Sequence, residues 1–287
     1  MENFDTLFPD ERHLGETTLR QAQFVMLRIL KVVDFICRKH RISYWMCFGT
    51  LLGAVRYKGF IPWDDDLDIA MLREDYERFV QIAKEELPED MFLQTRENEK
   101  EYDYLPVPCK IRDTKSITES SYLNKQKYHK GIFIDVFPFD RFHRHGIEHK
   151  KDYFLKQYNR LISKCFDADM GIDTTIVKEF VAHFKPVFRW LLLNYQRKIA
   201  PVIEKNKQIP DKDCFVGHGF NTPWIRKMSM SEVFPLQEIT FEGQLFFAPG
   251  NTDAYLRHIY GSTYMTPPPK EQQVSPHHVI IKPIIDF

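Results

Sequence analysis

The sequence predicts a mixed α+β fold, and two patterns along the chain carry this prediction. Short apolar, β-prone segments alternate with amphipathic helical segments over the first 140 residues and return beyond residue 211. Between them, residues 149–207 have a helical pattern without loop-like punctuation before Pro186. We therefore expect a mixed α/β core with a helical insert.

The expected elements begin at Thr18, which with Gln21 has the spacing of a capping box and opens a helix that ends near residues 39–41. The later elements, in chain order, are a strand at 42–48, a turn at 49–53 that enters a short helix ending near residue 59, a strand that contains the acidic run at 64–68, a helix at 75–86, strands at 105–112 and 131–138, the helical region 149–207, short strands beyond 211, a helix at 252–260 and an extended tail at 267–278.

Composition and charge indicate how large a core the chain can form and argue against one class of protein. Hydrophobic residues make up 43% of the 287 residues, which is enough for one large domain or two modest ones. Lys plus Arg and Asp plus Glu both total 40, so a general nucleic-acid binder is not expected, although a local basic pocket for a phosphorylated small molecule remains open.

The first residues, the lack of a long apolar stretch and the pattern of cysteines together indicate a reducing compartment. No signal-peptide pattern opens the chain, and no stretch approaches the roughly 20 apolar residues of a membrane helix. The five cysteines are scattered and form no C-x-x-C pair. We expect neither a disulfide framework nor a zinc knuckle, and a cytoplasmic location.

The densest group of acidic side chains lies at residues 64–68, where four carboxylates fall within five positions. Apolar residues alternate with them from position 67 onwards, so in a strand Asp64, Asp66 and Asp68 would share a face and Asp65 would face away. Like charges on a partly buried strand need a cation between them, and carboxylate oxygens suit Mg²⁺ or Mn²⁺. We expect Asp66 and Asp68 to bind the metal, Asp64 to lie outside them, and Asp65 to bond the loop before it.

Residues 48–56 have the pattern of a turn that enters a helix, and backbone amides at a helix start bind phosphate. An ordinary tight turn is the alternative. The acidic run, 15 residues beyond Gly49, favours the phosphate cradle, because metal-dependent phosphoryl transfer needs both parts. The residues expected to face a donor phosphate here are Gly49, Thr50, Leu51, Arg56 and Lys58.

A third carboxylate, Asp135, lies within the apolar segment 131–138. An unpaired buried carboxylate is costly, so Asp135 either joins the metal site, as a ligand or as the base, or pairs with a Lys or Arg. Lys110 and Arg112 lie two residues apart on one strand face, where both would bind phosphate oxygens. A solvent-facing strand edge with protective cations is the alternative.

Histidines and aromatic residues supply weaker candidates. The spacing of His143, His145 and His149 permits a zinc site, but no cysteine or carboxylate completes it, so we expect none. His277 and His278 face opposite ways in an extended tail, so at most one enters the site. The aromatic residues that would stack on a base, or else pack in the core, are Trp45, Trp63, Tyr102 and Tyr104.

Three blocks of this sequence resemble the LicD/fukutin-type phosphotransferase family. Residues 44–69, YWMCFGTLLGAVRYKGFIPWDDDLDI, resemble its signature, and GIFIDVFP at 131–138 resembles its second block. Residues 255–261 and the Pro-Pro…His-His tail are similar to its closing block, although Ser262 and Thr263 stand where the family has an acidic residue.

The resemblance implies a nucleotidyltransferase-like core, which is a small mixed sheet flanked by helices. It assigns Asp66 and Asp68 to the metal pair, Asp135 to the later acidic position, and Gly49 and Thr50 to the turn that faces the donor phosphates. The expected layout is one family-type domain over 1–287, with the catalytic core at 18–140, the helical insert at 141–210 and a C-terminal segment at 211–287 that completes the site.

The resemblance also implies the chemistry. A Mg²⁺- or Mn²⁺-dependent phosphotransferase would move a substituted phosphate, such as phosphocholine, from a CDP-linked donor to a hydroxyl of a cell-surface glycan or its precursor, lipopolysaccharide or teichoic acid, and release CMP. Animal relatives carry an N-terminal membrane anchor that this sequence lacks, so we expect the bacterial branch, with peripheral contact at the inner face of a membrane left open.

Three other functions use similar residues. A nucleotidyltransferase would release pyrophosphate, and a glycosyltransferase with an Asp-x-Asp motif would release a nucleoside diphosphate. A non-catalytic nucleotide- or sugar-binding module is the third, and the intact set of Asp66, Asp68 and Asp135 argues against it.

Overall fold

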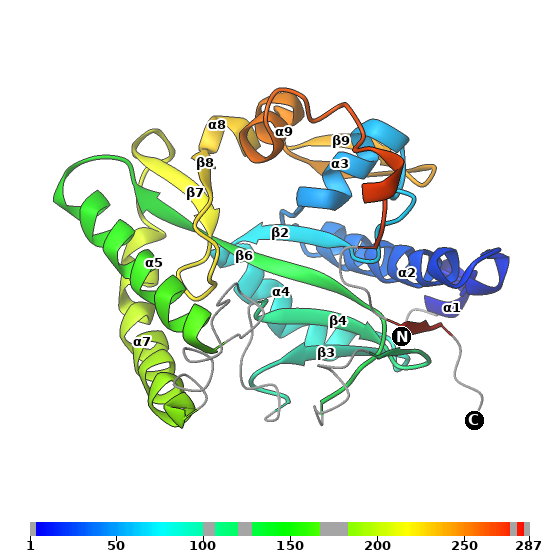
Figure 1. Cartoon of the computed structure of the whole chain (residues 1–287), viewed down its shortest axis with the longest axis horizontal. Coiled ribbons are helices and arrows are strands. Elements are labelled where there is room, and N and C mark those ends of the chain that lie inside the picture. The colour runs from blue at the N-terminus through cyan, green and yellow to red at the C-terminus, as the bar shows by residue number, and fades with distance from the viewer. Residues whose placement is uncertain (1–3, 100–106, 120–127, 167–182, 276–279, 284–287) are drawn as a thin grey trace. The chain divides into compact units, whose positions relative to one another are not determined.

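A computed structural model describes residues 4–99, 107–119, 128–166, 183–275 and 280–283 of the chain (Figure 1). The chain divides into two compact units. Unit 1 contains residues 1–103, 109–137 and 231–287, and unit 2 contains residues 104–108 and 138–230. The elements are those of a mixed α+β protein in which helices flank a mixed sheet, as the sequence predicts.

The sheet of unit 1 has the strand order β1-β2-β6-β4-β3. These strands are β1 (Trp45–Met46), β2 (Asp68–Leu72), β3 (Met91–Thr95), β4 (Cys109–Asp113) and β6 (Phe133–His143), the last of which continues into unit 2. The pairs β1–β2, β3–β4 and β4–β6 are antiparallel. All five residues of β2 are buried, so the two faces of this strand are both covered, which explains its almost continuous apolar sequence.

Helices α2 (Thr18–Lys39), α3 (Phe48–Tyr57) and α4 (Arg73–Glu86) pack around this sheet. The helix α2 buries one apolar face that includes Ile29, Leu30 and Val33, all 0% exposed. Its N-cap is Thr17, whose side chain accepts a hydrogen bond from the amide of Arg20 at 3.1 Å, so the cap lies one residue before the predicted one. The short elements before α2 are α1 (Phe4–Leu7) and η1 (Arg12–Leu14).

The C-terminal part of unit 1 adds smaller elements. A hairpin of β9 (Gln237–Phe241) and β10 (Gln244–Ala248) turns through Glu242 and Gly243, whose φ angles of 49° and 77° fit a tight two-residue hairpin turn. The remaining elements are β5 (Ile117–Glu119), which pairs with β11 (Ile280–Lys282), α8 (Met230–Val233), which starts at the last residue of unit 2, α9 (Thr252–Tyr260) and η4 (Lys270–Gln272).

Unit 2 combines the second half of β6 with two strands and two long helices. Residues 139–143 of β6 pair antiparallel with β7 (Cys214–His218), which pairs with β8 (Lys227–Ser229). The helices α5 (Gly146–Phe166) and α7 (Lys185–Asn206) lie alongside each other (Figure 1), and η3 (Asp211–Asp213) follows them. Its apolar core includes Phe142, Tyr195, Ile199 and Phe220.

Several predicted boundaries differ from the structure for local reasons. The strand predicted at 42–48 is only two residues long, because Cys47 already caps α3. The predicted strand 131–138 extends to His143, since its second half pairs with β7, whose residues lie 71 to 79 positions away in the sequence. The structure also has β3, which we did not predict. Of the predicted strand at 105–112, residues 105–106 lie outside the described residues.

Candidate functional site

The acidic run lies in a loop and at the first residue of β2. The strand begins at Asp68 rather than before Asp66, so strand alternation does not order the carboxylates of residues 64–67. Asp64 of the loop and Asp68 of β2 are nevertheless buried, each only 8% exposed. The prediction that a strand orders these carboxylates was therefore wrong for residues 64–67, while the expected partial burial is present.

Asp68 has the most perturbed electrostatics of the run. Burial raises the pKa of its carboxyl well above the ordinary value, and the nearby carboxylates of Asp66, Asp135 and Asp64 raise it further, against the opposing charge of Lys110. Burial also raises the pKa of the Cys47 thiol, with Asp68, Asp135 and Asp66 adding to it. Residues far apart in sequence thus place several carboxylates around one buried point.

Asp135 reaches this point from β6 and is ion-paired with Lys110. The two residues are direct partners in the β4–β6 register, and the Lys110 ammonium donates to the Asp135 carboxylate. The Lys110 nitrogen also lies 3.6 Å from the centre of the Phe133 ring. Burial raises the pKa of Asp135, while the charge of Lys110 and its hydrogen bond oppose that rise. The structural ion pair considered for Asp135 is therefore present, and it lies beside Asp68.

The start of α3 borders the acidic cluster. The Thr50 hydroxyl accepts a hydrogen bond of 2.7 Å from the Asp68 amide, so it fixes the first residue of β2 against the helix. A Cβ atom on Gly49 would lie 2.9 Å from Oδ2 of Asp64 and 4.0 Å from Oδ1 of Asp66. The carboxylates therefore lie directly beside the helix N-terminus, whose partial positive charge favours anions. The Leu51 amide is already used, because it donates to the Cys47 carbonyl.

Other predicted phosphate ligands have structural partners. The Arg56 guanidinium donates to the carbonyl of Tyr264, which ties the end of α3 to the C-terminal turn. Arg112 is 2% exposed and donates to Gln94 and to the Gly131 carbonyl, both at 2.6 Å. Since β4 lies between β3 and β6, the alternative of a protected sheet edge is wrong.

Lys58 is exposed at the end of α3, in a left-handed conformation with φ of 61°. Its carbonyl accepts a hydrogen bond from the Glu242 amide. Lys58 therefore connects the end of α3 to the β9–β10 hairpin. The predicted contacts of Gly49, Thr50, Leu51, Arg56, Lys58, Lys110 and Arg112 with a donor phosphate stay predictions.

Two polar side chains that the sequence did not single out hold the acidic loop. Gln23 of α2 is 3% exposed, and its amide donates to the Asp64 carbonyl at 3.0 Å. Glu242 pairs with Arg20 and accepts a hydrogen bond from the Phe60 amide at 3.1 Å. For Gln23 a signal existed, since a polar residue stands within the apolar face of an amphipathic helix; for Glu242 no local signal existed.

Asp65 has a different partner from the predicted one. Its Oδ2 accepts a hydrogen bond from the Ser275 hydroxyl at 2.5 Å, so it bonds the C-terminal segment and not the preceding loop. Its buried Oδ1 has no hydrogen-bond partner among the described residues. Asp65 therefore connects the acidic loop with the tail that leads to residue 276.

The carboxylate oxygens of the cluster are the type of ligand that a hard divalent cation binds. Carboxylate oxygens are the ligands that Mg²⁺ and Mn²⁺ prefer, and beyond the effect of burial, the nearby carboxylates of Asp66, Asp135 and Asp64 raise the pKa of Asp68, against the charge of Lys110. Among the described residues, no three His, Cys, Asp or Glu side chains are arranged closely enough to hold a metal ion as they stand. A metal at Asp66, Asp68 and Asp135 thus stays a prediction.

The histidines expected not to bind zinc have other partners. Nδ1 of His143 lies 2.9 Å from Oδ2 of Asp152, and Nδ1 of His149 lies 2.7 Å from the His143 carbonyl oxygen. His277 and His278 lie outside the described residues, so their predicted place in the site is not addressed.

Of the aromatic candidates, Trp45 is fully buried and makes an edge contact with Phe234, which is core packing. Trp63 is half-buried against Tyr57. Tyr102 and Tyr104 lie outside the described residues.

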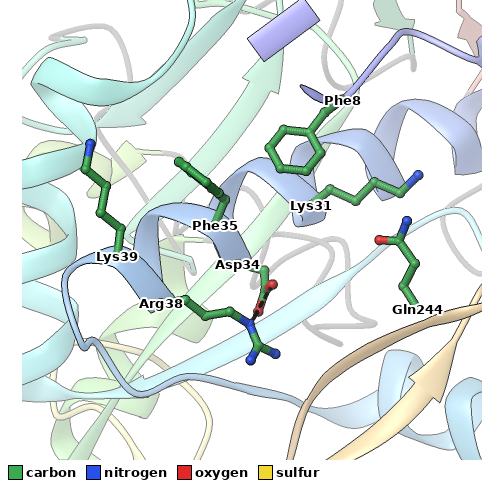
Figure 2. Close-up of a pocket in the computed structure, with 7 residues that line it drawn as sticks. All are labelled: Phe8, Lys31, Asp34, Phe35, Arg38, Lys39 and Gln244. Carbon is green, nitrogen blue, oxygen red and sulfur yellow. Dashed lines mark hydrogen bonds and ion pairs between the residues drawn. The ribbon is translucent and has the colours of Figure 1, made fainter. Parts of the chain in front are cut away.

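A pocket of about 330 Å³ on α2 contains none of these carboxylates (Figure 2). In this pocket the guanidinium of Arg38 bonds Asp34 at 2.8 Å. The pocket is lined by Phe8, Lys31, Asp34, Phe35, Arg38, Lys39 and Gln244. We therefore place the candidate site at the acidic cluster and not in this pocket.

Comparisons with known proteins agree with the resemblance. Residues 41–167 match the sequence profile described as LicD/FKTN/FKRP, nucleotidyltransferase domain. The lipopolysaccharide cholinephosphotransferase LicD of Haemophilus influenzae is 30% identical over 279 residues, which cover 93% of this chain and 98% of that protein. An uncharacterized protein of Rickettsia prowazekii is 33% identical over 134 residues, 46% of each chain. Within the described residues, no helix has the length and apolarity needed to cross a membrane.

Proposed function

The chain belongs to the LicD family and is a LicD-type phosphotransferase, and from this premise we propose that it transfers a substituted phosphate from a CDP-linked donor to a glycan hydroxyl. Phosphocholine is the substituent that we propose first, because the Haemophilus relative is a cholinephosphotransferase acting on lipopolysaccharide. The acceptor would be a cell-surface glycan or its lipid-linked precursor, and CMP would be the leaving group. The cytoplasmic location expected from the sequence stays a prediction.

One observation carries the proposal. The buried Asp68 has the carboxylates of Asp64, Asp66 and Asp135 nearby, and the first two lie beside the N-terminus of α3 in the block that resembles the family signature. Buried like charges are retained at a cost in stability, so a functional requirement explains them better than folding does. Asp66, Asp68 and Asp135 would hold Mg²⁺ or Mn²⁺, which when bound neutralises charge on the phosphate oxygens and on the leaving nucleotide.

The residues around the cluster supply binding and orientation. The amides of Gly49 and Thr50 lie in the first turn of α3, where the helix dipole favours a donor phosphate. Thr50 and Gln23 hold the backbone of the acidic loop and of Asp68 in place. Lys110 pairs with Asp135, while burial raises the pKa of this carboxyl, so Asp135 is proposed either as a ligand or as the base.

The transfer itself is a displacement at phosphorus. The acceptor oxygen forms a bond to the phosphorus that carries the alcohol, and its proton passes to a base. The bond from this phosphorus to the bridging oxygen of the diphosphate breaks, and CMP leaves with the electron pair. Catalysis then consists mainly of positioning and of neutralising charge, as in other phosphoryl transfers.

The test is product analysis with the full chain, CDP-choline and a glycan acceptor in Mg²⁺. We expect CMP and a phosphocholine-modified glycan, and we expect chelation of divalent cations to stop the reaction. Asp68→Asn should abolish transfer, whereas Asp65→Asn, which removes the same charge three residues earlier and keeps an acceptor oxygen for Ser275, should not. Pyrophosphate as product would mean nucleotidyl transfer, and transfer by Asp68→Asn at the wild-type rate would contradict the proposed site.

A further inference from the structure

The helix α5 of unit 2 buries polar side chains on its inner face. Asp152, Lys156, Asn159 and Ser163 are each at most 2% exposed, and their spacing of four, three and four residues places them on one side of the helix. Soluble helices usually bury the apolar side and expose the polar one. Along this helix, polar side chains therefore occupy part of the inner face, next to the apolar Leu155 and Ile162.

Specific hydrogen bonds fix α5 in this orientation. Asp152 accepts from the His143 amide at 2.8 Å, and Lys156 and Asn159 both donate to the Thr222 carbonyl at 2.7 Å. Rotation of the helix would break these bonds and leave buried polar groups unpaired, which is costly. The outward face is consequently set by the polar network and not by the preference of the outward residues.

That outward face is apolar. Ile147, Phe154 and Leu161 are 71%, 68% and 63% exposed, and their seven-residue spacing aligns them along the helix. Large apolar side chains exposed singly are common on protein surfaces, but three aligned on one helix form a stripe that indicates an interaction site.

The neighbouring helix α7 extends this surface. Glu148 pairs with Lys205, and Tyr158 contacts Tyr195. A step of ten residues forward along α5 thus corresponds to a step of ten residues backward along α7, so the two helices are antiparallel and in the same register at both contacts. The same register places Trp190, which is 62% exposed, level with residue 163 of α5 and so near the Leu161 end of the stripe. An exposed Trp beside basic residues is typical of proteins that lie at a membrane surface.

Charge indicates what kind of surface the two helices meet. Together α5 and α7 contain ten Lys or Arg and three Asp or Glu, whereas the whole chain contains 40 of each kind. Among the residues of the two helices whose burial the structure describes, the exposed cations are Lys150, Lys151, Arg189, Arg197, Lys198 and Lys205. An apolar stripe flanked by cations is complementary to an anionic lipid bilayer. In a symmetric dimer through the same face, these cations would face their own copies and repel each other.

We propose that the outer face of α5 and α7 is a peripheral membrane-binding surface that takes an anionic bilayer. Its role is to hold the enzyme where a lipid-linked glycan acceptor resides, so this inference extends the proposed function. Lipid binding itself, however, requires neither donor nor acceptor. It can therefore be measured independently of phosphotransfer.

The experiment is sedimentation of the full chain with vesicles of phosphatidylglycerol and phosphatidylcholine, or of phosphatidylcholine alone. The wild type should bind the anionic vesicles more tightly, and the binding should weaken with salt. Phe154→Ser should lower the partition coefficient by about tenfold, from the loss of one buried aromatic side chain. Lys151→Gln should lower it by about fivefold on anionic vesicles and hardly at all on neutral ones.

A matched control is Leu245→Ser, which removes a 56% exposed apolar side chain from β10 of unit 1 and should leave vesicle binding unchanged. Phe154→Ser should also release CMP at the wild-type rate with a water-soluble acceptor, so failure of membrane binding and failure of phosphotransfer are distinguishable. Equal binding of wild type and Phe154→Ser would overturn the proposal. So would a wild-type dimer in light scattering that Phe154→Ser dissociates, because the face would then be an interface between copies.

Discussion

The replacement Gly49→Ala tests whether the space beside the α3 N-terminus belongs to the site. The added Cβ would lie 2.9 Å from Oδ2 of Asp64, closer than carbon and oxygen atoms normally approach. The contact is with the end of a side chain, so the Asp64 carboxylate can move aside by a few tenths of an ångström. The backbone of Gly49 does not have a positive φ, so alanine itself is not strained there.

Two opposing terms set the expected stability of this variant. Alanine in place of glycine within a helix stabilises by roughly 1 kcal/mol, and displacement of a carboxylate in a tight space costs about as much. We therefore expect the free energy of unfolding to stay within about 1 kcal/mol of the wild type. Transfer should nevertheless fall roughly ten- to hundredfold, because small displacements of catalytic groups are costly to the rate.

The matched control is Gly53→Ala in the same helix. Its Cβ would lie 2.5 Å from the Gly59 carbonyl oxygen and 3.0 Å from the Ile61 nitrogen, both of which are backbone atoms that cannot swing away. This variant should lose about 1–3 kcal/mol of stability. Its melting temperature should fall by roughly 2–4 °C for each kcal/mol.

The assay combines thermal unfolding with CMP release under saturating CDP-choline, well below both melting temperatures. The reasoning predicts that Gly49→Ala separates activity from stability, whereas Gly53→Ala loses mainly stability. If Gly49→Ala transferred at the wild-type rate, the carboxylates beside Gly49 would not form part of the working site. If Gly53→Ala were as stable as the wild type, the backbone around residues 59–61 would yield more easily than the distances imply.

Three further predictions concern the buried charges. Because the folded-state pKa of Asp68 is raised, the folded protein binds more protons than the unfolded one above pH ~4, so its stability falls as pH rises through the folded pKa. Without divalent cations, Asp68→Asn should therefore be more stable than the wild type at pH 7.5 in urea unfolding. A stability gain that did not shrink towards pH 4 would contradict the proposed charge repulsion. Lys110→Met should lower the free energy of unfolding by roughly 3–5 kcal/mol, because it leaves the buried Asp135 carboxylate without its partner. The control Lys115→Met, at a 51% exposed lysine, should lower it by at most about 1 kcal/mol in the same urea titration. Thr50→Val should lower the free energy of unfolding by about 1–3 kcal/mol, because the buried Asp68 amide loses its acceptor. Thr50→Ser keeps the hydroxyl and should retain most of this stability in thermal unfolding. Equal losses in the two variants would mean that packing, and not the hydrogen bond, is responsible.

The sequence predicted the local elements well where a periodic pattern was long and continuous. The helices α2, α4 and α9 agree with prediction to within about two residues, because amphipathic periodicity and end signals act within each segment. It missed β3 and shortened β6, since both depend on pairing with distant strands. Strand alternation also failed for residues 64–67, because they form a loop and β2 begins only at Asp68.

At the candidate site, the sequence alone determined which side chains are present: the acidic run, the glycine-containing turn before it and a third Asp within an apolar segment. It also determined the family, through the order and spacing of those residues. Only the tertiary structure decided that Lys110 pairs with Asp135, that Arg112 is committed to Gln94, and that Asp65 binds Ser275. The physical reason is that these contacts join residues 18 to 210 positions apart, and only strand register and helix packing bring such residues within hydrogen-bonding distance.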